Sequence, residues 1–181
     1  MTQIPPTTKI ETRPEPWLRG TLTEVPAERR AVLHALELAR EDIALWCGLL
    51  SEREMHAVPY GLASVAFQLR HIAGSLDRLL TYAEGNQLNG AQLKMLAAEM
   101  LPEGSKEEIL AKFEAGLHNA ERRIRAIDLA RWQESREVGR KKLPTTVAGL
   151  LIHCAEHTQR HVGQAITTVK VLLALREQPS T

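Results

Sequence analysis

The sequence lacks an excess of charge of either sign. It has 23 Lys and Arg residues against 22 Asp and Glu residues, which leaves a formal net charge of +1. No face has to be strongly basic, so nucleic acid is not expected as a partner. The sequence also lacks any apolar run of about 18 residues, the length that a membrane span needs. Its N-terminus, "MTQIPPTTKIETRPEPW", has no apolar signal core. We therefore expect no membrane partner.

Cysteine is scarce as well, with only Cys47 and Cys154 in 181 residues. Each lies in a helical pattern, so the pair does not indicate a disulfide framework, and a reduced cytoplasmic setting is expected. We find no internal repeat, no low-complexity tract and no series of alternating strands. The hydrophobic share of 44% is that of an ordinary globular protein, long enough to bury one core.

What the sequence does contain is a set of long amphipathic segments. Residues 1–16 hold four prolines and no sustained period, so they are predicted to form an extended N-terminal arm before a single domain at 17–181. Within that domain, apolar residues recur at helical spacing in four stretches. The predicted helices cover about 27–50, 62–83, 105–127 and 144–175.

These four helices predict an all-α fold, a four-helix bundle. The connector between helices two and three has about 20 residues, too many for a tight antiparallel turn, so we expect a crossover connection there. Ser105 and Glu108 have the spacing of a capping box at the start of helix three. Pro144 and Thr145 are predicted to open helix four, after a polar connector at 133–144.

Helix four carries three histidines spaced four residues apart: His153, His157 and His161. At about 100° per residue they share one face of the helix. Neighbours four apart have Cβ atoms about 5–6 Å apart, close enough to hold one ion, whereas the outer pair is separated by a rise of about 12 Å. At most two adjacent histidines should therefore be metal ligands. Spacing alone leaves the pairs 153/157 and 157/161 open.

A transition-metal site usually needs a third protein ligand. His71 is the best candidate, because it lies inside helix two but off its leucine stripe. Its face also holds Ser64, Phe67, Gln68, Ser75 and Tyr82. Such a face suits either a lined cavity or the solvent side. His34 and His118 stand among charged neighbours, which favours surface positions, and His56 falls in a loop.

The sequence of this helix allows three other interpretations. "HCAEH" matches the H-x-x-E-H pattern of inverted zinc proteases, in which the Glu is the general base. On a helix, however, Glu156 points about 100° away from His157, and no histidine follows His161. Cys154 projects close to His161 and could be a ligand, although its apolar neighbours favour a buried thiol. The histidines could also be coincidental, in a metal-free interaction bundle.

Three segments together resemble a known family. They are "PWLRG" at 16–20, "FQLRHIAGSLDRLLTY" at 67–82 and "LLIHCAEHTQRHVGQ" at 150–164. In this order they are similar to the DinB/YfiT-like superfamily of metal-dependent enzymes, over nearly the whole chain from Trp17 onward. The resemblance implies a four-helix bundle with a crossover connection, often a homodimer.

The resemblance also implies a divalent metal, zinc or nickel, held by one histidine of helix two and two of helix four. By position these ligands are His71, His157 and His161, which makes His153 a pocket residue beside them. We expect the remaining groups of the pocket to orient a small-molecule substrate. These groups are Gln164, Tyr82 and Gln68.

The leading functional hypothesis is a metalloenzyme whose three-histidine site leaves one coordination position open. The ion would activate water or a low-molecular-weight thiol, giving a hydrolase or a thiol transferase. The competing hypothesis is a noncatalytic bundle, metal-sensing or stress-related, in which the metal only links helices two and four. A structural site of that kind would be closed by a fourth protein ligand.

Overall fold

The computed structural model describes residues 13–177, so most of the predicted N-terminal arm (1–16) lies outside the described residues. The helices are α1 (Ala27–Cys47), α2 (Glu52–Met55), α3 (Val65–Ala83), α4 (Gly90–Ala98), α5 (Lys106–Ala126) and α6 (Val147–Arg176). Short 3-10 turns lie at Pro16–Leu18, Pro59–Gly61 and Leu129–Arg131. Strands β1 (Ser135–Val138) and β2 (Leu143–Thr146) pair as an antiparallel hairpin.

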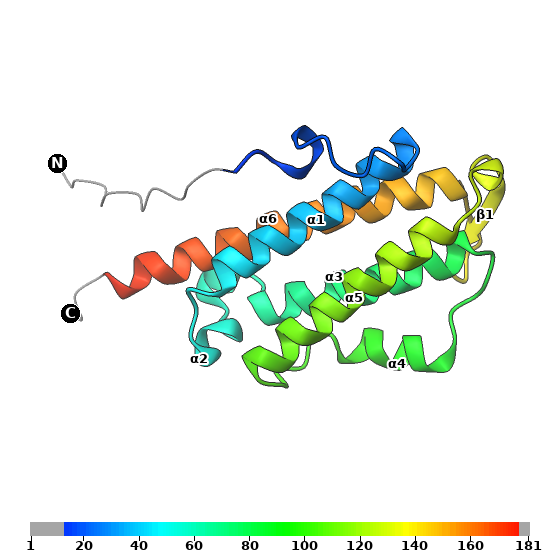
Figure 1. Cartoon of the computed structure of the whole chain (residues 1–181). Coiled ribbons are helices and arrows are strands. Elements are labelled where there is room, and N and C mark those ends of the chain that lie inside the picture. Colours follow the sequence, from blue (N-terminus) through cyan, green and yellow to red (C-terminus); the bar gives the residue numbers. More distant parts are fainter. Residues whose placement is uncertain (1–12, 178–181) are drawn as a thin grey trace.

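The four long helices α1, α3, α5 and α6 form the predicted bundle (Figure 1). Helix α3 packs against both α5 and α6, and α1 packs against the same two helices. Helices α1 and α6 run in one direction and α3 and α5 in the other. Among the described helices, none combines the length and the hydropathy that a bilayer span requires.

The predicted crossover between the second and third long helices is confirmed. Helices α3 and α5 lie side by side and parallel, with Gly116 against Ala73 and the Arg123 guanidinium 2.7 Å from the Asp77 carboxylate. The chain must therefore return along the bundle before α5 begins. It does so through α4, which runs back beside α3 (Figure 1): Gln92 contacts Thr81, and Glu99, seven residues later, contacts His71.

Local signals set the helix starts, and the apolar stripes form the core. The capping box predicted at Ser105 and Glu108 is present, with each side chain accepting a hydrogen bond from the other residue's backbone N–H. Ser64 caps α3 by accepting from the N–H of Phe67. The stripe of α3 is fully buried at Leu69 and Ile72. Polar groups on another face of this helix lie next to α6, where Gln68 and His71 contact His161.

The start of the fourth long helix differs from the prediction. Pro144 and Thr145 belong to strand β2, where Thr145 pairs with Arg136 of β1, and α6 begins at Val147. The Thr146 side chain caps α6 by accepting from the N–H of Gly149. The prediction was wrong because proline suits an extended strand as well as a first helical turn, and β-branched threonines favour the strand. The hairpin falls in the stretch expected to be an irregular connector.

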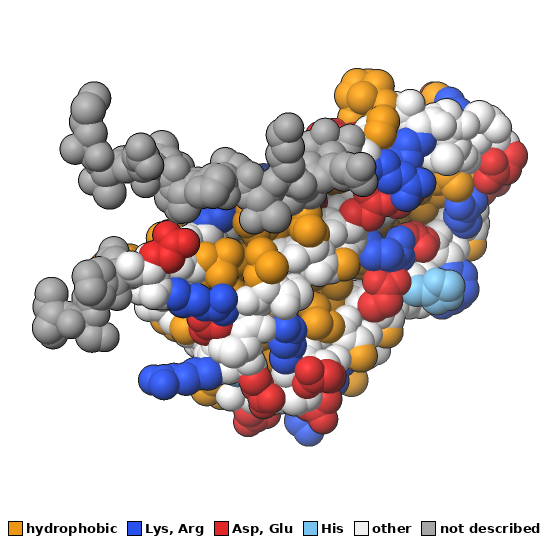
Figure 2. Space-filling view, turned by 60° about the vertical axis from the view of Figure 1, so that its left-hand side comes forward, with side chains coloured by type: hydrophobic (Ala, Val, Ile, Leu, Met, Phe, Trp, Pro, Cys, Tyr) orange, Lys and Arg blue, Asp and Glu red, His pale blue; other side chains and the backbone are white. Residues whose placement is uncertain are grey.

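His34 also differs from its predicted surface position. It is only 6% exposed, and its Nε2 lies 3.1 Å from the hydroxyl of Thr21. The segment before α1 folds back over that helix and covers the imidazole, which charged neighbours in the sequence could not reveal. His118, by contrast, is exposed on α5 as predicted. On the face shown in Figure 2, acidic and basic side chains are interspersed among apolar ones.

Candidate metal centre

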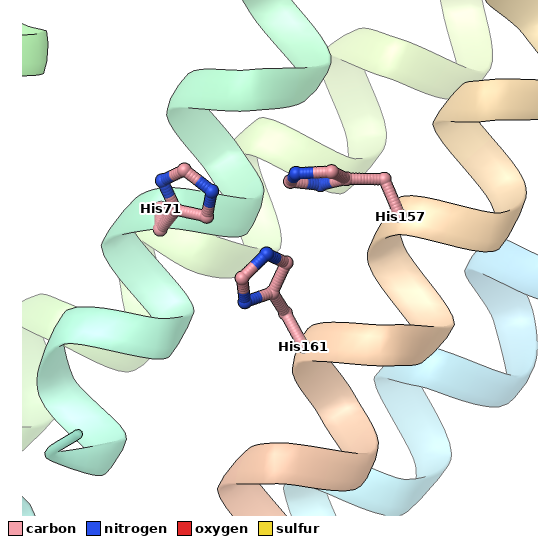
Figure 3. A group of neighbouring side chains, drawn as sticks. All are labelled: His71, His157 and His161. Carbon is pink, nitrogen blue, oxygen red and sulfur yellow. The ribbon is translucent and has the colours of Figure 1, made fainter. Parts of the chain in front are cut away.

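Three imidazoles from two helices meet where α3 crosses α6 (Figure 3). His71 comes from the middle of α3, and His157 and His161 come from successive turns of α6. The ring of His161 lies 4.4 Å, between centroids, from each of the other two, and the rings of His71 and His157 are 5.1 Å apart. One nitrogen from each residue lies within 4.8 Å of the others. The antiparallel packing of α3 on α6 thus brings the three predicted ligands together.

His71 is held in place by a carboxylate from outside both helices. Its Nδ1 lies 2.7 Å from Oε2 of Glu99, which follows α4 and is buried. The other oxygen of Glu99 accepts a hydrogen bond of 2.6 Å from the guanidinium of Arg78, also buried. An ionised carboxylate only accepts, so His71 donates from Nδ1, and the tautomer that binds a metal carries its lone pair on Nε2. That nitrogen has only the Ser75 hydroxyl within reach, at 3.3 Å.

His161 is oriented in the same way by an amide. Its Nδ1 lies 2.6 Å from Oε1 of Gln68, whose side chain is buried one turn before His71 on α3. Because the amide oxygen accepts, the ring donates from Nδ1 and the lone pair is again on Nε2. Two of the three rings therefore have a fixed tautomer, with the same nitrogen free to bind an ion.

The cluster favours the uncharged form of the two histidines of α6, because it lowers the pKa of each. Burial, followed by the adjacent imidazoles of His161 and His71, lowers the pKa of His157 to about 4. Burial likewise lowers the pKa of His161, with His71 as the next cause. A metal ion binds the neutral form of histidine, so no proton has to leave these two rings at pH 7.

The comparison with known families rests on this part of the chain. The model of the DinB superfamily matches residues 35–165, a range that contains α3, α4 and all three clustered histidines. The chain belongs to the DinB superfamily. No curated protein matches it.

In this DinB-superfamily chain, the other predicted pocket residues lie at different distances from the cluster. Gln68 contacts His161, and Gln164 is exposed one turn after His161, where its side chain acts to raise the pKa of that ring. The ring of His153 is 5.3 Å from that of His157, but its Nδ1 is bonded to Glu156 at the surface. Tyr82 is buried 11 residues after His71 on α3, a rise of about 16 Å.

The rival interpretations find little support in these positions. Glu156 points outward to His153, at 2.5 Å, and not to the cluster, so it is not placed as the base of an inverted zinc protease. Cys154 is fully buried, and burial raises the pKa of its thiol to about 12, as expected for an inert thiol. Cys47 and Cys154 are both free, which confirms that they form no disulfide. The polar face of α3 lines the contact with α6 and does not face bulk solvent, with Gln68 and Ser75 buried.

The donor set of the DinB-superfamily site fits a divalent transition metal. Zinc binds imidazole nitrogens at about 2.0–2.1 Å, which separates two tetrahedral ligand atoms by about 3.4 Å. The nitrogens of the cluster lie within 4.8 Å of one another, so small side-chain rotations would bring them to that separation. Three neutral imidazoles suit zinc and nickel better than calcium or magnesium, which prefer oxygen.

Sequence reasoning missed Glu99 and Arg78. Glu99 lies in the crossover connector, 28 residues from His71, and its stretch "LAAEMLPEG" carries no periodic signal that predicts a buried carboxylate. One residue hints at it: Gly74, an otherwise unexplained glycine inside α3. A Cβ there would lie 2.5 Å from Oε1 of Glu99 and 2.7 Å from Nη1 of Arg78, so any other residue would force the ends of these two paired side chains to shift.

Proposed function

We propose that this protein is a divalent-metal-dependent enzyme in which His71, His157 and His161 bind zinc or nickel. The observation that carries the proposal is the pair of fixed tautomers. His71 and His161 each donate from Nδ1 to a buried acceptor, which leaves Nε2 free in a cluster with His157. An imidazole that is oriented in this way by an outer partner is typical of metal ligands.

A Lewis-acidic ion held there would supply activation of a water or a low-molecular-weight thiol as nucleophile near neutral pH. The chain itself supplies the rest of the site. Its neutral imidazoles leave the charge of the ion uncompensated, and Phe67 stacks on His71 at 5.4 Å, which shields one side of the ring from water. Gln164, exposed beside His161, is well placed to hydrogen-bond a bound small molecule.

The alternative, a purely structural metal, would need a fourth protein ligand. Among the described residues, the group of side chains able to share one ion consists of the three histidines alone. The nearest carboxylate, Glu99, has its oxygens engaged by Arg78 and by Nδ1 of His71. The thiol on α6, Cys154, is fully buried and does not belong to this group. These features favour a metal ion with an open coordination position, and therefore a catalytic role over a structural one.

The first test is metal content and affinity. Protein purified without chelator should contain close to one zinc or nickel per chain, and an anomalous-scattering map should place the ion between the three rings. Apo wild type should rebind zinc. The His71→Ala variant should bind zinc much more weakly, and the exposed control His118→Ala should bind it as tightly as wild type. Wild-type protein that binds no divalent metal would overturn the proposal.

The second test separates the reactions. Metal-loaded protein should be assayed against ester and amide substrates for hydrolysis, and against thiol-plus-electrophile pairs for thiol transfer. Turnover that needs both a thiol and metal identifies a transferase, and turnover without a thiol identifies a hydrolase. If His71→Ala lowers the melting temperature of metal-loaded protein and no substrate is turned over, the structural alternative holds.

The homodimer and the small-molecule substrate, possible thiols included, stay predictions. Leu45, near the end of α1, and Leu49, just after it, are more than 40% exposed and offer an apolar surface for a second copy. Light scattering on the purified protein would decide the oligomeric state.

A further inference from the structure

The crossover helix α4 is attached to the bundle mainly by two polar anchors. Between Gly90 and Glu99 only Gln92 and Glu99 are buried. The Gln92 amide donates to Asp77 and Thr81 of α3, and Glu99 binds His71 and Arg78. The apolar residues of this stretch are largely exposed. They are Leu93, Met95 and Leu96, at 44%, 61% and 41%.

The space beneath α4 is not tightly filled. A groove of about 710 Å³ lies between α3, α4 and α5, with Gly74, Ala98 and Glu99 along its wall. A helix that covers a groove and buries few apolar side chains depends on its polar contacts for its position. Of the two anchors, Glu99 is the one that touches the candidate metal ligands.

The Glu99 contact places a carboxylate inside the bundle, where its desolvation costs free energy that a surface contact would avoid. A buried carboxylate is strongly unfavourable unless it is paired and hydrogen-bonded. Arg78 supplies the pairing charge, and Gly74 supplies the room by having no Cβ. The carboxylate still has an acceptor oxygen left for Nδ1 of His71, at 2.7 Å.

The two supported ligands differ in the partner that holds them. His161 donates to Gln68, a neutral amide on α3 itself, in the rigid core of the bundle. His71 donates to a charged carboxylate delivered by the crossover segment. A carboxylate is the stronger acceptor and makes the ring a better donor to a metal ion. The orientation and basicity of His71 therefore depend on where α4 sits.

We propose that Glu99 is a positioning residue for the metal site, and that metal binding and the docking of α4 strengthen each other through the Glu99–His71 contact. This inference rests on the proposed function, because it concerns the same ion. Linkage makes the effect reciprocal: whatever docked α4 adds to metal affinity, bound metal adds to the docking of α4.

The test measures metal affinity and backbone protection in the full chain. Zinc affinity is obtained by competition with a chromophoric chelator, for wild type, Glu99→Gln, Glu99→Ala and the control Glu103→Gln, an exposed carboxylate of the same connector. Loss of an outer partner typically weakens metal binding about 10- to 100-fold. We expect Glu99→Ala near the upper end, Glu99→Gln near the lower end, and Glu103→Gln unchanged.

Hydrogen exchange supplies the reciprocal readout. Adding zinc to wild type should slow exchange of amides 90–99, and adding it to Glu99→Ala should leave them as fast as in the apo protein. Gly74→Ala approaches the same contact from the other side, because its Cβ would displace the Glu99 carboxylate. It should reproduce the Glu99→Ala results with every carboxylate still present.

The outcomes separate the two proposals. If wild type binds zinc and the Glu99 variants bind it equally well, the inference is wrong and the metal site stands. If the Glu99 variants only lower the melting temperature of apo protein, without changing zinc affinity, Glu99 is structural and the inference is again wrong. If wild type binds neither zinc nor nickel, both proposals fail together.

Discussion

The two contacts that α3 makes on either side of His71 are held by different forces. On the α6 side, Gln68 and His71 contact the histidines of α6, beside an apolar core in which Leu69 and Val162 are at most 1% exposed. Toward α4, two polar anchors hold a helix whose apolar residues are largely exposed. The core thus fixes where the three rings are, whereas a polar contact fixes which way one of them faces.

The largest effect on the metal site is expected from removing one of its three imidazole rings. His157→Ala takes away one of three nitrogen donors, and we expect zinc affinity to fall by more than the roughly 100-fold that outer partners contribute. The four-helix core does not include this side chain, so circular dichroism of the apo variant should be that of wild type. Zinc competition is the measurement, with exposed His118→Ala as control, and equal affinity in the two variants would contradict the site.

A core substitution tests the α3 packing directly. Leu69 is 0% exposed, and Leu69→Ala should lower the free energy of unfolding of apo protein by about 2–5 kcal/mol through lost burial and a residual cavity. Urea denaturation followed by circular dichroism measures it. A loss below about 1 kcal/mol would mean that the bundle does not depend on this stripe.

Much of the bundle could be predicted from the sequence because its determinants are local. The 3.6-residue period of α3 marks Leu69 and Ile72 as buried, and the Ser105 capping box marks the start of α5. The length of the connector indicated the crossover. The hairpin was missed because Pro144 and the threonines after it are compatible with a strand or a helix start, and pairing with β1 decides between them.

The candidate metal ligands could be predicted from the sequence, but the residues that orient them could not. Four-residue spacing placed the histidines of helix four on one face, and the position of His71 off the leucine stripe made it the best third ligand. The family resemblance then selected His157 and His161 as its partners. Geometry alone had left His153 and His161 as equal candidates. Glu99 could not be found, because its contact with His71, 28 residues earlier on α3, depends on how the crossover segment packs. A glycine at position 74 is too weak a signal to reveal that contact.

The pH dependence of the stability of the apo protein tests how strongly the cluster favours uncharged histidine. Burial lowers the pKa of His157 to about 4, against about 6.5 in an unfolded chain. Between these values the unfolded state binds more protons than the folded state, so the free energy of unfolding falls as the pH drops from about 6.5 toward 4. Urea denaturation with chelator present, at pH 7 and pH 5, should show this fall, and His157→Gln should reduce it. If the free energy of unfolding falls equally in the variant, titratable groups other than His157 cause the pH dependence.

The smallest expected effect bears most directly on the α4 side of the comparison. Leu96 is a large apolar residue at the centre of the crossover helix, yet it is 41% exposed. If Gln92 and Glu99 hold α4, Leu96→Ala should change the free energy of unfolding by no more than about 0.5 kcal/mol, the usual range for surface substitutions. The same denaturation experiment that measures Leu69→Ala serves as its matched reference. A loss for Leu96→Ala close to that of Leu69→Ala would mean that α4 is docked by apolar burial. The orientation of His71 would then no longer depend on a single carboxylate.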